Sequence, residues 1–121
     1  MAVNWSGTYS ITTGASGTSS GSNSGTTLNN LAAVWPTGAQ GLTNFTVRIT
    51  GGTGVGQTRV ISSNTSTQLT VPAWSVIPDN TSRYEVIALI KNGDHFTAAT
   101  TFSTNVITEL EDSATIYVDG N

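Results

Sequence analysis

The first residues that suggest chemistry are a set of spaced glycines. Gly52-x-Gly54-x-Gly56 resembles the spacing of a loop that wraps a nucleotide phosphate. Such a loop opens a helix, and its phosphate-binding form closes with Lys followed by Ser or Thr. Neither feature follows Gly56. The pattern therefore predicts a hairpin turn, because glycine accepts the positive φ of a tight reversal.

His95 is the single histidine and the only candidate for the base of a catalytic triad. A triad places an imidazole between a nucleophilic serine and a carboxylate. Asp94 is adjacent in sequence, but neighbours on a strand point to opposite faces. No motif marks any one of the many serines as a nucleophile. The sequence thus offers no catalytic residue, and we expect that the protein is not an enzyme.

An acidic set near the C-terminus is the best candidate for a metal site, with Glu109, Glu111, Asp112 and Asp119 as its members. Calcium takes about six to eight oxygen ligands, and the spacing matches no loop with the glycine such a site requires. The chain has no cysteine, which excludes thiolate sites and disulfides. We expect no metal and no cofactor, and an acidic turn that is solvated or meets a basic patch on a partner.

Length and composition limit the kinds of partner that the protein can have. A chain of 121 residues is one domain with a small core, and small cores often depend on oligomerisation. Only 9% of the residues are charged and the net charge is −3, so no basic footprint for nucleic acid is present. No apolar run reaches membrane-spanning length, and the N-terminus lacks the pattern of a signal peptide. We expect assembly in a cytoplasm, with neither nucleic acid nor membrane as a partner.

Short alternating stretches between turn residues predict the elements that position these side chains. They predict about seven to nine strands and an all-β fold, a compact antiparallel sandwich or barrel. A single helical turn is expected within residues 28–36. Asn92-Gly93 predicts a hairpin that joins residues 85–90 to residues 95–102. Residues 86–90 are apolar on both faces, which indicates a central strand or one that a partner covers.

Residues 28–87 resemble a β-module that recurs in virion proteins of tailed bacteriophages. In that module a Gly-rich turn leads to a GQ-R-I strand, an NT-TLTV arm and a W-PD-TS-Y corner. The family more often has an acid where this chain has Asn29. Head and tail proteins both carry the module. The matching residues here are Gly54, Gly56, Gln57, Arg59, Ile61, Asn64, Thr65, Leu69, Val71, Trp74, Pro78, Asp79, Thr81, Ser82 and Tyr84.

The N-terminus predicts an extended arm on a linker. Val3, Trp5, Tyr9 and Ile11 share one apolar face of a strand. Residues 13–27 contain only small or polar residues and span roughly 20 Å as a coil or about 50 Å when stretched.

We therefore expect an arm and linker over residues 1–27 and a β-domain over residues 28–121. The four apolar residues of the arm would pair with a neighbouring subunit or with the particle surface. The alternative for the arm is a strand of the chain's own sheet, and the alternative for the linker is a surface loop within the same subunit.

The resemblance implies a structural protein of a phage virion. We expect a capsid decoration, or cement, protein on the outer head shell, a homotrimer that clamps subunits of the major capsid protein. The alternative is a tail-fibre, spike or head-fibre module that adheres to a host surface or glycan. The short chain, which begins at Met1 and has no coiled coil, favours the first. Trp74, Pro78 and Tyr84 are expected to pack in the core or at a subunit interface.

Overall fold

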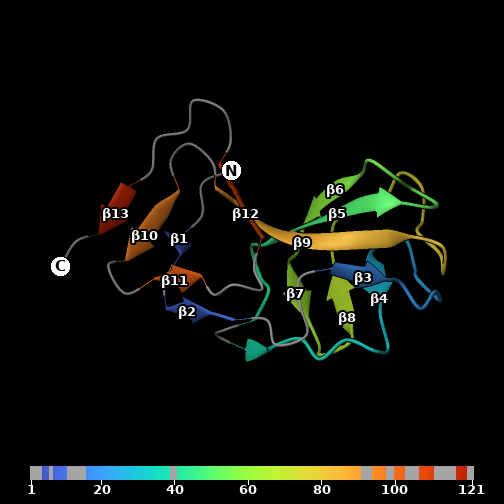
Figure 1. The fold of residues 1–121 in the computed structure, drawn as a ribbon, viewed down its shortest axis with the longest axis horizontal. Helices are drawn as coiled ribbons and strands as arrows, with labels where there is room; N and C mark the ends of the chain where they lie inside the picture. Colours follow the sequence, from blue (N-terminus) through green and yellow to red (C-terminus); the bar gives the residue numbers. More distant parts are fainter. Residues whose placement is uncertain are drawn as a thin grey trace.

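The computed structural model describes residues 4–5, 7–10, 16–38, 41–90, 94–97, 100–102, 107–110 and 117–119. Every regular element longer than one residue in these ranges is a β-strand, so the predicted all-β class is confirmed. Figure 1 shows the strands in two regions, a sandwich and a smaller layer that holds the terminal strands. In the described part of the chain, no helix is long and apolar enough to cross a membrane.

The largest sheet has the order β12 (Ile107–Leu110), β9 (Arg83–Ile90), β5 (Thr46–Gly51) and β6 (Thr58–Val60). β5 runs antiparallel to both of its neighbours, whereas β12 runs parallel to β9. A short strand, β3 (Ser16–Thr18), also pairs antiparallel with β9. Alternation of β-branched and polar residues along β5 gives it one buried and one half-exposed face.

The long strand β9 is the centre of this sheet. β5 occupies one edge, and β3 and β12 share the other, where β3 pairs at residues 83–85 and β12 at residues 87–90. Its even-numbered residues face the core, and Ile87 on the opposite face is only 2% exposed. The stretch that is apolar on both faces is therefore a central strand, covered within its own chain.

The predicted hairpin between residues 85–90 and 95–102 is wrong. β10 (His95–Thr97) pairs with β1 (Asn4–Trp5) and β13 (Tyr117–Asp119) and not with β9. The physical reason is that both edges of β9 are already taken. Residues 91–93, which contain the Asn-Gly turn signal, lie outside the described residues.

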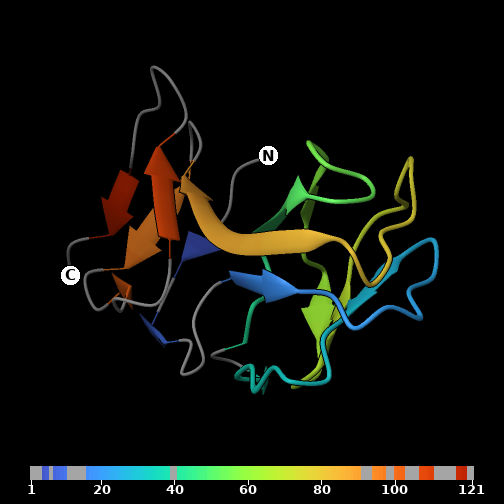
Figure 2. The same cartoon turned by 45° about the vertical axis from the view of Figure 1, so that its right-hand side comes forward.

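The second sheet has the order β4 (Thr27–Asn29), β8 (Gln68–Thr70) and β7 (Ser63–Asn64), with antiparallel pairs throughout. Leu28 and Leu69 are register partners, both fully buried, in the core that the two sheets enclose. Figure 2 shows this sheet facing the largest one, and the arrangement is a sandwich and not a closed barrel. The helical turn predicted within residues 28–36 is wrong, because Leu28 lies in a strand and residues 30–36, all of them described, contain no helix.

The terminal layer consists of parallel pairs. β1 (Asn4–Trp5) and β13 (Tyr117–Asp119) flank β10, and β2 (Thr8–Tyr9) pairs with β11 (Thr101–Phe102). The antiparallel prediction thus holds for most of the sandwich and fails here. Parallel neighbours cannot be joined by a tight turn, so strands that pair in this way come from separate parts of the chain. These pairings therefore bring the two ends of the chain together.

In the segment predicted as a flexible linker, the described residues 16–27 pack along the sandwich. After β3, the backbone N–H of Ser20 donates to Asn29 O at 2.9 Å, and the Asn29 N–H donates to Asn23 Oδ1 at 2.7 Å. These bonds satisfy the outer edge of β4, which would otherwise present unpaired backbone groups. Small polar side chains suit this task. β4 spans the boundary expected between residues 27 and 28, and the division of the chain into an arm with its linker and a β-domain stays a prediction.

Candidate functional site

Three loops meet at the end of the sandwich that lies away from the chain termini, on the right in Figure 1. They are residues 19–26, 51–57 and 72–82, and we call this surface the apical face. The first and third loops are joined by a bond from the Ser19 N–H to Ser82 O at 2.8 Å. Asn23 Nδ2 donates to Pro78 O at 2.8 Å. These bonds connect the first loop to the third.

The middle loop is the glycine turn, and it joins β5 to β6 as a hairpin. This confirms the prediction from the glycine spacing. Gly52, Gly54 and Gly56 have φ values of 73°, 83° and 95°. At Gly52 a side chain is also excluded by space, because a Cβ atom would overlap Thr81 O. Glycine is needed there both for its backbone conformation and for the close approach of the third loop.

Gln57 fastens the glycine turn to the third loop. Its Nε2 donates to Val76 O at 2.7 Å and to Gly54 O at 3.1 Å. Its Oε1 accepts from the backbone N–H groups of Ser75 at 2.8 Å and Val76 at 3.0 Å. The side-chain amide thus uses both donors and its acceptor to hold one loop against the other.

Asp79 fastens the other side of the turn. Its carboxylate accepts from Thr81 Oγ1 at 2.6 Å, from the Thr81 N–H at 2.8 Å and from Thr53 Oγ1 at 2.8 Å. These bonds stabilise the charged form, so the Thr81 hydroxyl, its backbone N–H and Thr53, in that order, lower the pKa of Asp79. Ser82 Oγ adds a bond to Thr53 O at 2.6 Å.

Arg59 closes the free edge of β6. Its Nε donates to Ala73 O at 2.9 Å, and its Nη1 donates to Thr58 O at 2.7 Å. The guanidinium carbon lies 5.6 Å from the centre of the Trp74 ring. The third loop and the arginine together cover an edge that would otherwise be open to another strand.

The apical face presents aliphatic side chains on this fixed framework. Val55, Val76 and Ile77 are 62%, 51% and 48% exposed. Exposed apolar side chains that form a contiguous patch are typical of contact surfaces between proteins. The arrangement offers recognition by shape and apolar contact, and among the loop residues described it brings together no set of groups for covalent catalysis.

A second exposed aliphatic pair lies in the turn after β4. Leu31 and Val34 are 77% and 58% exposed, while Ala33 and Trp35 between and beyond them are buried. Asn30 fixes the turn, because its Oδ1 accepts from the Ala32 N–H at 3.1 Å and its Nδ2 donates to Tyr84 Oη at 2.7 Å.

Trp74, Pro78 and Tyr84, three residues of the W-PD-TS-Y corner, pack inside the chain. Trp74 and Tyr84 are 6% and 3% exposed, and Pro78 is buried. Trp74 Nε1 donates to Thr27 O at 3.0 Å. Burial raises the pKa of Tyr84, an effect that the bond from Asn30 partly opposes. Within the chain these residues are core supports of the apical face.

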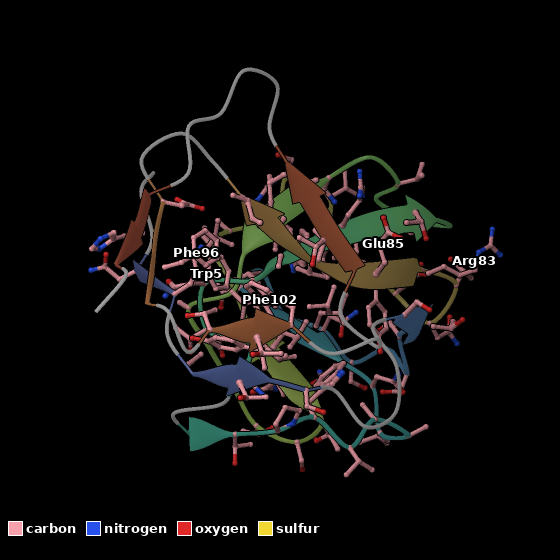
Figure 3. All side chains as sticks on the ribbon, turned by 60° about the vertical axis from the view of Figure 1, so that its left-hand side comes forward. Trp5, Arg83, Glu85, Phe96 and Phe102 are labelled. Atoms are coloured by element: carbon pink, nitrogen blue, oxygen red, sulfur yellow. The ribbon has the colours of Figure 1, made fainter. Side chains whose placement is uncertain are left out.

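The N-terminal anchors also lie in the chain's own core. Trp5 is 1% exposed and Tyr9 is 8% exposed, in a cluster with Phe45, Phe96 and Phe102. Figure 3 shows Trp5, Phe96 and Phe102 gathered in one region, away from Arg83 and Glu85. The structure therefore shows the alternative arrangement, a strand of the domain itself, while pairing with a neighbour stays a prediction. Val3 and Ile11 lie outside the described residues.

Of the residues considered for catalysis and metal binding, those that the structure describes are not gathered into one group. Asp94 is fully buried and accepts a bond from Trp5 Nε1 at 3.2 Å, whereas His95 is exposed. Among the described residues, no group of three His, Cys, Asp or Glu side chains comes together. Glu111 and Asp112 lie outside the described residues.

Sequence reasoning missed the exposed residues of the apical face, because apolar residues are by default assigned to a core. The available signal was the position of Val55 between two glycines of a turn, where no strand buries it. Val76 and Ile77 directly precede the Pro78 corner, which is a comparable signal.

Comparison with known proteins yields no relative: no family model, no curated protein and no solved structure matches this chain.

Proposed function

We propose that this protein is a structural component of a phage virion, a decoration protein that binds the outer head shell through its apical face. The observation that carries the proposal is the set of exposed aliphatic side chains on loops held rigid by Gln57, Asp79 and Arg59. A preorganised apolar surface binds without a large cost of ordering. The major capsid protein is the proposed partner, with assembly in the host cytoplasm.

The resemblance to the phage module supports this proposal at the level of single residues. Gly54, Gln57, Asp79 and Thr81 belong to the matching pattern and also build the apical face. The part of the chain that carries the resemblance is thus largely the part that forms the candidate contact surface. Proteins that attach in the same way are expected to share the residues that build their contact surface.

The alternative, adhesion to a host glycan, is less well supported. Sugar-binding surfaces commonly use exposed aromatic rings as stacking platforms. All three tryptophans are buried, at 1%, 3% and 6% exposure. An adhesive role would have to rely on other contacts.

The sequence argument for the proposed homotrimer, an apolar strand that a partner covers, does not apply in this structure. Residues 86–90 suggested a face for a partner, but the chain itself covers Ile87. Self-association therefore remains part of the proposal and is tested by sedimentation velocity. A species of one chain at every concentration would count against it.

The direct test is attachment to phage heads that lack this protein. Purified chain is expected to bind with hundreds of sites per head, and Val76→Asp should abolish saturable binding because it places a charge in an apolar contact. Val34→Asp is the matched control, since Val34 is exposed to a similar extent, 58% against 51%, but lies in another loop. A few copies per particle would indicate a tail or fibre position instead, and no binding would refute the proposal.

A further inference from the structure

Four charged side chains at the apical face and on the adjoining sheet have partners within the chain. Arg59 donates to backbone carbonyl groups, and Asp79 accepts from two hydroxyl groups and a backbone N–H. On the largest sheet, Arg48 Nη2 lies 2.8 Å from Glu85 Oε1. These four groups already have their contacts before another protein approaches.

Arg83 differs from them, because its guanidinium has no hydrogen-bond or ion-pair partner among the described residues. It is the first residue of β9, it is exposed, and it directly follows the third loop of the apical face. Figure 3 shows it at the rim of the molecule. The N–H donors of its guanidinium are therefore available to a partner.

A glycine on the neighbouring strand makes room for this guanidinium. Gly51 is the register partner of Arg83, and a Cβ atom at Gly51 would overlap Arg83 Nη2 and lie 2.8 Å from its Cζ. The φ of Gly51 is not positive, so the missing side chain matters here through space. The guanidinium thus lies against the start of the glycine turn, a contact that uses none of its N–H donors.

A carboxylate is the protein group that best fits a guanidinium in this position. The planar guanidinium can donate two parallel hydrogen bonds to one carboxylate. Glu85 is two residues away in sequence, but it is paired with Arg48. Apolar side chains of the same face would exclude water from a pair formed with a partner, and a pair shielded from water attracts more strongly.

We propose that Arg83 determines which surface the apical face accepts, and that the accepted surface carries a carboxylate beside an apolar patch. The aliphatic side chains supply contact area, whereas the charge pair sets the orientation and excludes partners that lack the acid. Arginine is among the residues that most often dominate the energy of such contacts. This inference rests on the proposed function and adds the chemistry of the partner surface to it.

The test is binding of the full-length chain to phage heads that lack this protein, at about 50 mM and about 500 mM NaCl. Arg83→Gln should bind about tenfold more weakly than the unmodified chain at the lower salt concentration. The difference should shrink to about twofold or less at the higher concentration, because salt screens the charge pair.

Ser66→Glu is the matched control, because it also lowers the net charge by one. Ser66 is exposed in the turn between β7 and β8, outside the three loops of the apical face. This variant should bind like the unmodified chain at both salt concentrations.

Gly51→Ala separates the placement of the guanidinium from its charge. The variant keeps Arg83, but the added methyl group displaces the guanidinium from its contact with the backbone. Binding at the lower salt concentration should weaken about threefold. Binding equal to that of the unmodified chain would overturn the part assigned to Gly51.

Two results for Arg83→Gln would overturn the proposal and leave the proposed attachment intact. They are binding equal to that of the unmodified chain, and a loss of the same size at both salt concentrations. Failure of the unmodified chain to bind would instead refute the proposed function, and this inference with it.

Discussion

The apical face and the terminal layer both have to hold short segments in place, and they do so with different kinds of contact. The apical face holds three loops in place with hydrogen bonds between nearby backbone groups and the side chains of Gln57 and Arg59, which donate, and of Asp79, which accepts. The terminal layer holds two-residue strands in place with stacked aromatic rings. Because hydrogen bonds hold the loops of the apical face, its apolar side chains can protrude. In the terminal layer the aromatic rings themselves hold the strands, and they are therefore buried in the core.

The two regions also differ in the distance along the sequence over which they are connected. The bonds of Gln57 and Asp79 link residues 2 to 26 positions apart. The bond between Trp5 and Asp94 links residues 89 positions apart. The cost of closing a loop grows with its length, so the terminal layer must recover more free energy from packing. The comparison predicts that single changes cost more in the terminal layer than in the apical face.

Trp5→Ala should have the largest effect on stability. The substitution removes a ring that contacts four others and leaves the buried Asp94 without its indole donor. We expect a loss of about 3–5 kcal/mol in the free energy of unfolding, measured by guanidinium denaturation. Trp5→Phe, which keeps an aromatic ring, should lose about 1–2 kcal/mol. A loss below about 1 kcal/mol for Trp5→Ala would mean that the terminal layer folds independently of the sandwich.

Gly52→Ala should be the most damaging change in the apical face. A Cβ atom there meets Thr81 O and sits on a backbone with a φ of 73°. We expect a loss of about 2–3 kcal/mol, with reduced binding to phage heads because the third loop must shift. Gly56→Ala separates the two causes, since its φ is 95° but no atom lies within 4 Å of the added Cβ. It should cost about 1 kcal/mol, and equal losses for both variants would mean that the close contact is unimportant.

Gln57→Ala should have a smaller and more local effect. The amide makes four bonds, but it lies near the surface, where water replaces lost partners. We expect a loss of about 1 kcal/mol and faster hydrogen exchange at the Ser75 and Val76 amides, measured by NMR. Gln68→Ala is the matched control, with a single side-chain bond to Asn29 Oδ1 at 2.8 Å. Equal exchange rates in both variants would show that Gln57 does not hold the loop.

The comparison also explains which features the sequence could predict. The glycine turn, the strands around it and the buried corner at Trp74 and Tyr84 were predictable, because their patterns and contacts are mostly local. Period-two alternation and turn residues carry that information directly. The exposure of Val76 was not predictable, since an isolated apolar residue gives no sign of which way it faces.

The terminal layer was beyond such reasoning for a physical reason. Parallel pairing between β1 and β10 depends on which strand edges remain open after the sandwich forms. Asn92-Gly93 signalled a hairpin, but the occupied edges of β9 overrode that local preference. The polar segment around Asn23 misled in the same way, because its low hydrophobicity indicated a free linker whereas its side chains cap a strand edge.

The smallest expected effect concerns the charge of Asp79 and tests whether the apical face depends on it. The folded-state pKa of this carboxyl is lowered from 3.8, first by the Thr81 hydroxyl and then by the Thr81 N–H and Thr53. Ionised Asp79 therefore stabilises the fold above pH 3.8, and this contribution is lost as the pH falls from there through the lower folded-state pKa. Asp79→Asn should lower the guanidinium midpoint at neutral pH, and its difference from the unmodified chain should shrink at about pH 3. A difference that stays the same at both pH values would mean that the loops are held by the geometry of the bonds alone and not by the charge.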